Sequence, residues 1–312
     1  MCIFAGPVQS VTNTNLFARL TGEGTQLLAY QMNYVTANEN AMILPIPVAT
    51  PSREDSLRFI SLKGYDQFFR HLDSAFPVPR PLIRNRVDSP SRASNSIPKL
   101  KVEEVGDFVA SFVPTMDDFS RLDQRFVIPK SSWDKIPRYS DYGFAVFQLK
   151  SLRGKPHPMA FEFETRLEDE VFFPTVHIHD GEVHEREEFD HTLYLQNEEF
   201  DKVVGDFQNH RTKDRQTGFV RSQDVAKKRV NIDKSVGMIE PDLLLHRVKI
   251  RGKLENKDVF ASVRPQASGG PRFGTLLPLT TVIGGSGLGW LIERRNRLRN
   301  SNAAASGTPT DA

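Results

Sequence analysis

The sequence is nearly free of cysteine, since Cys2 is the only one in 312 residues. One thiol excludes an intrachain disulfide framework and every zinc or iron–sulfur pattern that needs several cysteines. The chain does not open with a charged segment and an apolar run, so a standard secretory signal peptide is not expected. These absences favour a reducing, cytoplasmic location.

An excess of charge of one sign is also missing. Lys and Arg total 41 and Asp and Glu total 39, which leaves a formal net charge of +2. We therefore expect no nucleic-acid partner, because such binding needs a basic field. The chain has no P-loop, no G-x-G-x-x-G after a strand and no G-x-S-x-G, so neither a nucleotide cofactor nor serine-hydrolase chemistry is indicated.

Long uncharged runs are rare, and the clearest one is 273–292, which basic residues follow. Its length fits a C-terminal membrane tail anchor. Pro278 and the glycines between Gly284 and Gly289 make the run weakly apolar, however, so a Gly-rich turn before a short basic helix is the other interpretation. Membrane attachment is expected only through this segment.

Strand-like alternation fills the rest of the chain and predicts an α+β fold of antiparallel sheets with few helices. A layered αββα sandwich is one arrangement that fits. The first 50 residues predict a meander of strands with a turn at 12–15, and the spacing of Phe68, Phe69, Leu72 and Phe76 predicts a helix. Later segments are expected as a helix at 218–230, a hairpin across 255–257, and strands at 105–114, 142–152, 157–166, 172–179 and 182–189.

Four regions follow from this organisation. A strand meander with its helix spans 1–76, and a linker rich in Pro, Ser and Arg spans 77–100. A strand-rich body covers 101–265, and a Gly-rich apolar segment with a basic tail covers 266–312.

The position of Cys2 suggests a chemical role. Removal of Met1 would place a free amine and a thiol on one residue, and the amine, with an ordinary pKa near 8, can accept the thiol proton. The start at residues 2–4 and the later Arg19 resemble the opening of cysteine-type N-terminal nucleophile hydrolases, the group of choloylglycine hydrolase and penicillin acylase. The resemblance implies an amide-bond hydrolase with a small-molecule amide substrate.

The same resemblance assigns roles to individual residues. It implies that Cys2 is nucleophile and base, that Arg19 assists the thiolate or the substrate, and that Asn33 or Asn38 donates to the oxyanion. The usual aspartate shortly after the arginine is replaced here by Thr21 and Gly22. The segments 41–48 and 173–184 resemble bacterial proteins of no assigned chemistry.

Four histidines between 177 and 191 suggest a second site. Asp180 and Gly181 predict a two-residue hairpin turn, which would pair His177 with His184 and His179 with Glu182. These four side chains would then share one face, about 5 to 7 Å apart, opposite the buried face of Val176, Ile178 and Val183. His191 lies beyond the hairpin and joins only if the chain bends.

Imidazoles at this spacing suit zinc or another divalent transition metal, and a metal-bound water would be the attacking group. The alternative is a solvated polar face with no ligand. Three classes of function therefore stay open: a hydrolase acting through Cys2, a metal-binding β-protein using His177, His179, His184 and Glu182, and a non-catalytic binding or scaffold protein.

Overall fold

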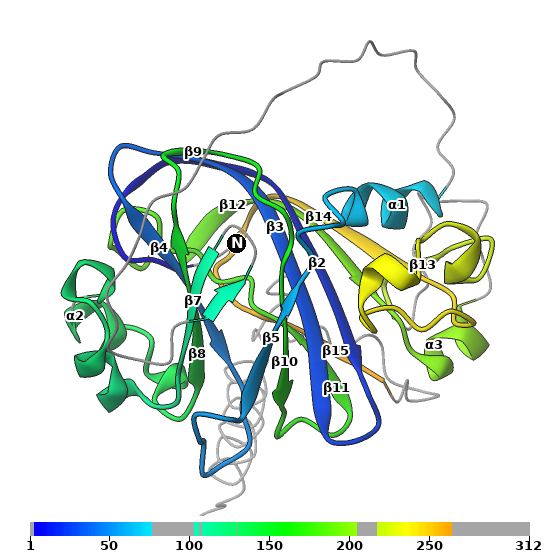
Figure 1. Ribbon diagram of the computed structural model, residues 1–312, viewed down its shortest axis with the longest axis horizontal. Helices are drawn as coiled ribbons and strands as arrows, with labels where there is room; N and C mark the ends of the chain where they lie inside the picture. Colours follow the sequence, from blue (N-terminus) through cyan, green and yellow to red (C-terminus); the bar gives the residue numbers. More distant parts are fainter. Residues whose placement is uncertain (1–2, 77–102, 106–107, 129, 205–216, 264–312) are drawn as a thin grey trace, which may run out of the picture. The chain divides into compact units, whose positions relative to one another are not determined.

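The structure is a computed structural model that describes residues 3–76, 103–105, 108–128, 130–204 and 217–263 (Figure 1). All of these residues belong to one unit, Met1–Gly274. The expected linker 77–100 and the uncharged run 273–292 lie outside the described residues, as does Cys2. None of the helices in the described ranges has the length and apolarity that a membrane crossing requires.

Strands dominate the described chain. They are β1 (Ile3–Phe4), β2 (Val8–Leu20), β3 (Thr25–Thr36), β4 (Asn40–Ile46), β5 (Leu57–Ser61), β6 (Glu103–Val105), β7 (Phe108–Val113), β8 (Gly143–Leu149), β9 (Arg153–Gly154), β10 (Met159–Glu164), β11 (Glu170–Phe173), β12 (Arg186–Leu195), β13 (Val220–Arg221), β14 (His246–Glu255) and β15 (Val259–Ser262). The α-helices are α1 (Phe68–Ser74), α2 (Lys130–Trp133) and α3 (Glu198–Val203). Short 3₁₀ turns are Met116–Arg121, Gln124–Phe126, Pro137–Tyr139, Ala226–Lys228 and Asp233–Ser235.

Two large sheets organise the described residues. One has the order β1-β4-β8-β7-β6, and the other follows β13-β14-β12-β2-β3-β10-β5 with β9 against β3, while β11 and β15 form a separate pair. The pairings are antiparallel except for β12 with β2, which is parallel. The predicted α+β class with strand-rich sheets and few helices is confirmed. Each large sheet mixes strands from the expected regions 1–76 and 101–265.

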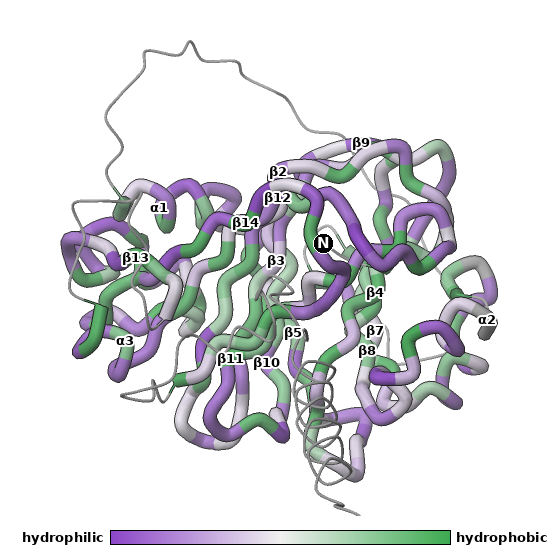
Figure 2. The backbone as a smooth tube through the Cα atoms, turned by 180° about the vertical axis from the view of Figure 1, so that it is seen from behind, coloured by the Kyte–Doolittle hydropathy of each residue, from purple (hydrophilic) through white to green (hydrophobic). Residues whose placement is uncertain are grey.

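The larger sheet is buried on both faces over part of its length, where β2 and β12 have consecutive apolar residues. On β2, Leu16 and Ala18 pack in the cluster shared with the smaller sheet, whereas Phe17 between them packs with α1. The same alternation holds on β12, where Leu193 faces the first cluster and Tyr194 the second. Figure 2 shows hydrophobic residues concentrated on these strands.

The predicted helix forms as α1, with Phe68, Phe69 and Leu72 buried against the second cluster. An ion pair joins the C-terminal end of α1 to β14 of the larger sheet. The guanidinium of Arg247 donates to Asp73 Oδ1 at 2.6 Å and lies over the ring of Phe76, 4.3 Å from its centroid.

Four sequence expectations are wrong. The first strands are not a simple meander, because β4 leaves β3 and pairs with β1 and β8 in the other sheet. The expected turn at 12–15 is a β-bulge inside β2, where Asn13 has a φ of 52° and the register to β3 shifts.

The segment 218–230, expected to be helical, contains β13 and one 3₁₀ turn instead. Its N-terminal part pairs with β14, so a sheet edge overrides helix propensity. The fourth error is the hairpin across 255–257. β14 pairs with β12 and β13, while β15 pairs with β11, so the turn between them carries the chain from one sheet to another.

Candidate functional site

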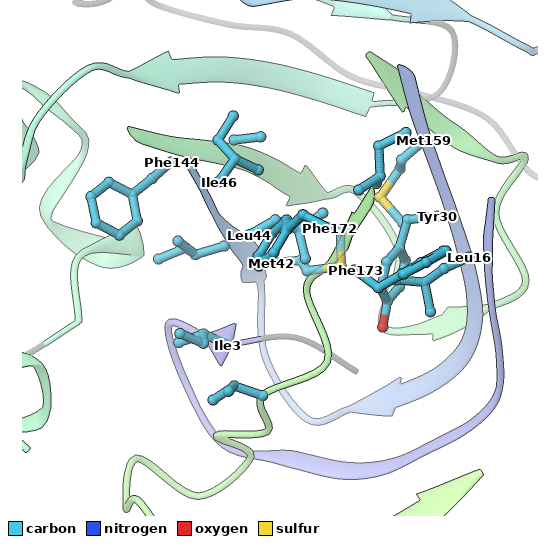
Figure 3. Packing of buried hydrophobic residues seen from close by; sticks show 14 of the residues in the cluster. Ile3, Leu16, Tyr30, Met42, Leu44, Ile46, Phe144, Met159, Phe172 and Phe173 are labelled. Carbon is cyan, nitrogen blue, oxygen red and sulfur yellow. The ribbon is translucent and has the colours of Figure 1, made fainter. Parts of the chain in front are cut away.

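β1 is the edge strand of the smaller sheet and lies between β4 and the histidine-bearing segment. Ile3 pairs with Ile43 of β4, and on its other side it forms a parallel bridge with Ile178. The N–H of Phe4 donates to the carbonyl of Ile178 at 3.1 Å. Ile3 has no exposed surface and lies in the same cluster as Met42 and Leu44 of β4 (Figure 3).

Asn40 fixes the turn that follows β1. Its carboxamide accepts from the N–H of Gly6 at 2.9 Å and donates to the carbonyl of Gly6 at 2.8 Å. Sequence reasoning missed this residue. A polar side chain at the start of the apolar stretch 41–46 was the signal available for it.

Three imidazoles gather beside β1. The ring centroids of His177 and His179 lie 5.3 Å apart, and those of His177 and His191 lie 5.1 Å apart. His179 also contacts the ring of Phe4 at 5.9 Å, edge to face. His191 belongs to the same cluster because β12 pairs with β2, where His191 lies opposite Thr14. This pairing brings His191 back toward His177, as the sequence required.

The cluster is buried, not solvated. His177 and His191 have no exposed surface, whereas His179 is half-buried at the end of the segment. The expected division into an apolar buried face and a polar open face is therefore wrong for His177, since Ile178 is buried as well. Both sides of this segment pack against protein.

Burial determines the charge state of these rings. Desolvation lowers the pKa of His179 to about 4 and lowers the pKa values of His177 and His191 as well. All three imidazoles are consequently neutral near pH 7. Within the described residues, neither ring nitrogen of His177 has a hydrogen-bond partner. Burying a polar atom without a hydrogen-bond partner costs free energy, so stability alone does not explain why an imidazole occupies position 177.

The remaining two predicted metal ligands lie elsewhere. His184 is exposed, and its Nε2 lies 3.0 Å from Asp180 Oδ2, which raises the pKa of His184. Glu182 is exposed and forms an ion pair with Lys135. In the described part of the chain, no group of three His, Cys, Asp or Glu side chains is arranged to hold a metal ion.

The predicted hairpin pairing is also replaced, although the turn itself is present with Gly181 at a φ of 87°. β11 pairs with β15, and β12 begins at Arg186 with β2 and β14 as neighbours. The side chain of Asn256 bridges the two arms, because its Nδ2 donates to the carbonyls of His177 and His184 at 2.9 and 3.0 Å.

The three other residues implied by the hydrolase resemblance lie on β2, on β3 and in the turn after β3. Arg19 faces the second cluster, where it donates to the carbonyls of Gly237 and Met238 at 3.0 and 3.3 Å. Asn33 alternates with the buried Met32 and Tyr34 and so lies on the opposite face of β3 from them. Asn38 is exposed in the turn after β3.

A polar turn that sequence reasoning did not identify as functional supports the histidine segment. Asn256 Oδ1 accepts from the N–H of His177 at 2.7 Å. Asp258 Oδ1 accepts from the N–H groups of Thr175 and Val176 at 2.8 and 3.2 Å, and its Oδ2 accepts from the Tyr139 hydroxyl at 2.6 Å. Asn256 and Asp258 are both buried, so these hydrogen bonds lie inside the protein.

No protein-family model and no curated protein matches the chain. Solved structures similar to it include baculovirus P35, with a TM-score of 0.44 and 16% identity over 84% of this chain and 99% of that one. A mutated baculovirus P35 after caspase cleavage gives 0.42 and 17% over 80% and 99%, and the caspase-8/P35 complex gives 0.38 and 14% over 81% and 97%. TM-scores this low at such identities do not establish a shared fold.

Proposed function

We propose that the protein is a cysteine-dependent amide-bond hydrolase, in which the Cys2 thiol is the nucleophile and the imidazole of His177 accepts its proton. The observation that carries the proposal is the position of β1. Ile3 forms a bridge with Ile178, the residue after His177, and one peptide bond joins Ile3 to Cys2. Consecutive Cα atoms are about 3.8 Å apart, so the covalent chain limits how far the thiol can lie from this segment.

The imidazole of His177 can serve as base only beside a negative charge, because burial lowers its pKa and so opposes proton uptake. An imidazole that is unprotonated at pH 7 has a free nitrogen lone pair, and a thiolate beside it would favour the protonated ring through opposite charge. His177 is also the member whose ring nitrogens have no hydrogen-bond partner within the described residues. Its proton-accepting capacity is therefore not used by a neighbouring donor there.

The reaction would follow the usual course of acyl transfer. The thiol proton passes to the imidazole as sulfur attacks the amide carbonyl, and the same proton then goes to the leaving amine as the C–N bond breaks. Water hydrolyses the resulting thioester, which releases a carboxylic acid and restores the thiol. Because His177 supplies the base, this course does not require the free α-amine of Cys2.

Alkylation of Cys2 by iodoacetamide at pH 7 tests the proposal most directly, because Cys2 is the only thiol. We expect the native protein to react faster than the urea-unfolded chain, and His177→Ala to react on the order of tenfold more slowly than wild type. His71→Ala is the matched control, since His71 lies on α1 and is hydrogen-bonded to Tyr65, a residue of the other cluster.

Hydrolysis of a panel of short N-acyl coumarin amides provides the second measurement. We expect Cys2→Ala to abolish it. An unreactive native thiol, or equal alkylation rates in wild type and His177→Ala, would contradict the proposal. Stoichiometric zinc in untagged protein would favour the metal-binding alternative in its place, and intact mass reports whether Met1 is removed.

A further inference from the structure

We propose that Asn256 is a positioning residue for the His177 imidazole, and that the turn 255–258 exists to hold this ring beside β1. The inference rests on the proposed function, because it names what places the base. Asn256 acts through the backbone of His177 and would not touch the substrate.

The side chain of Asn256 makes three hydrogen bonds. Its Oδ1 accepts from the N–H of His177 at 2.7 Å, and its Nδ2 donates to the carbonyl of the same residue at 2.9 Å. A third bond, from Nδ2 to the carbonyl of His184, ties the returning arm to the same side chain at 3.0 Å. The side chain of Asn256 thus makes the hydrogen bonds to the His177 backbone that a neighbouring strand would make in a regular sheet.

Fixing the backbone at both its N–H and its carbonyl restricts rotation of the peptide planes on either side of His177. The side-chain direction then follows from the backbone, and the ring packs against Phe189, with centroids 4.4 Å apart. The backbone N–H groups of Thr175 and Val176 are held by Asp258 from the same turn. Three consecutive residues are therefore held by side chains of one short turn.

Regular strand pairing does not fix the position of His177. Between β11 and β12, the described segment 174–185 has one isolated β-bridge, that of Ile178 with Ile3. The carbonyls of His179 and Glu185 also accept from the backbone N–H groups of Val8 and Asn256. A segment with so little ladder would be loosely placed without side-chain support. Buried carboxamide and carboxylate groups cost free energy to desolvate, so their concentration under one histidine indicates a need for placement.

The test uses Cys2 alkylation at pH 7 in Asn256→Ala, compared with a matched control. Gln196→Ala also removes three hydrogen bonds from a buried carboxamide, two donated to the carbonyls of Glu240 and Leu243 and one accepted from the N–H of Glu240. Those bonds lie away from the histidine segment. We expect both variants to lose stability in urea to a similar degree, while only Asn256→Ala changes the alkylation rate.

The sign of the change separates placement from mere packing. If Asn256 places the base, Asn256→Ala reacts more slowly than wild type, on the order of tenfold, as a displaced catalytic group does. If Asn256 only keeps the region closed, the same variant exposes the thiol and reacts faster, which would overturn the inference. An unchanged rate would overturn it as well.

A second variant covers the case in which Asn256→Ala does not fold. Asn256→Asp keeps the acceptor for the N–H of His177 and loses both donated bonds, so we expect an intermediate rate and a changed ring ¹⁵N signal of His177. A wild-type signal and rate would argue against placement. Should His177→Ala itself react like wild type, the proposed function fails. Should His177→Ala be slow and both Asn256 variants normal, only the inference fails.

Discussion

The imidazole rings of His177 and His191 lie nearly parallel, with their centroids 5.1 Å apart and an interplanar angle of 27°. The two rings come from different segments, yet both are fully buried. Such a contact is compatible with two neutral rings. It is unfavourable once either ring is protonated, because the new charge would be buried away from water.

The first prediction is therefore a loss of stability in mild acid. The pKa of His179 falls from its ordinary 6.5 to about 4 in the folded protein, and those of His177 and His191 are also lowered. Below pH 6.5 the unfolded chain binds protons that the folded chain does not, so stability present above that pH is lost as the pH falls toward the folded values. His179 alone accounts for about 2 kcal/mol between pH 7 and pH 5.

Urea unfolding at pH 7 and pH 5 measures this difference. His177→Phe replaces one buried ring by an apolar one and should reduce the loss between the two pH values. Equal losses in wild type and His177→Phe would show that His177 does not contribute to the loss.

The second prediction concerns Asp73 at the end of α1. Its Oδ1 accepts from Arg247 at 2.6 Å and from the Tyr194 hydroxyl at 3.2 Å, and the Arg247 side chain is only 3% exposed. Asp73→Asn leaves this guanidinium buried without its counter-charge, and we expect a loss of about 2 kcal/mol in the free energy of unfolding. Partial exposure of Asp73 keeps the loss below that of a fully buried pair.

Asp242→Asn is the matched control for that variant. Asp242 pairs with Lys227, and both side chains are more than half exposed. We expect the control to change stability by less than about 1 kcal/mol in the same urea titration. Similar losses in the two variants would mean that burial of Arg247 does not matter.

Alternation in the sequence was enough to predict the strand-rich class, but not which sheet each strand joins. Residues 41–46 look like the next strand of a meander, yet β4 pairs with β8, which lies about 100 residues later in the chain. Nothing local distinguishes these partners, because apolar strands buried on both faces fit either sheet. Asn13 similarly looks like a turn residue, although its positive φ produces a bulge within one long strand.

The candidate site was only partly predictable for a related reason. Local spacing placed His177 and His179 together, and the structure keeps them in contact. His191 lies on β12 and Asn256 in the turn after β14, so only the tertiary fold brings them near His177. The hairpin geometry failed because Asn256 takes the backbone groups that a ladder would have used.

The third prediction concerns the Tyr139 hydroxyl. It donates to Asp258 at 2.6 Å, both side chains are buried, and burial raises the pKa of Asp258. Tyr139→Phe removes one donor from a buried carboxyl group, and we expect a loss of about 1 to 3 kcal/mol in the free energy of unfolding. Tyr34→Phe is the control, because its hydroxyl donates to the backbone carbonyl of Ser151 instead. A loss in Tyr34→Phe as large as that in Tyr139→Phe would contradict the special role of the carboxyl partner.

The fourth prediction concerns close packing at Gly143, the first residue of β8. A Cβ built there would lie 2.8 Å from two ring atoms of Phe112 and 3.1 Å from a methyl group of Val48. Phe112 is only 6% exposed, so its ring has no solvent into which to move. Gly143→Ala should therefore cost about 1 to 3 kcal/mol in the free energy of unfolding, as overpacking of a core does.

Gly64→Ala is the control for this effect, since nothing lies within 4 Å of a Cβ at that position and its φ is not in the left-handed region. It should be nearly neutral. The clash itself is tested by adding Phe112→Leu to Gly143→Ala, because a smaller side chain frees the space that the new methyl group needs. The double variant should then lose less stability than the sum of the two single losses, and a strictly additive result would show that the ring of Phe112 is not what excludes a side chain at Gly143.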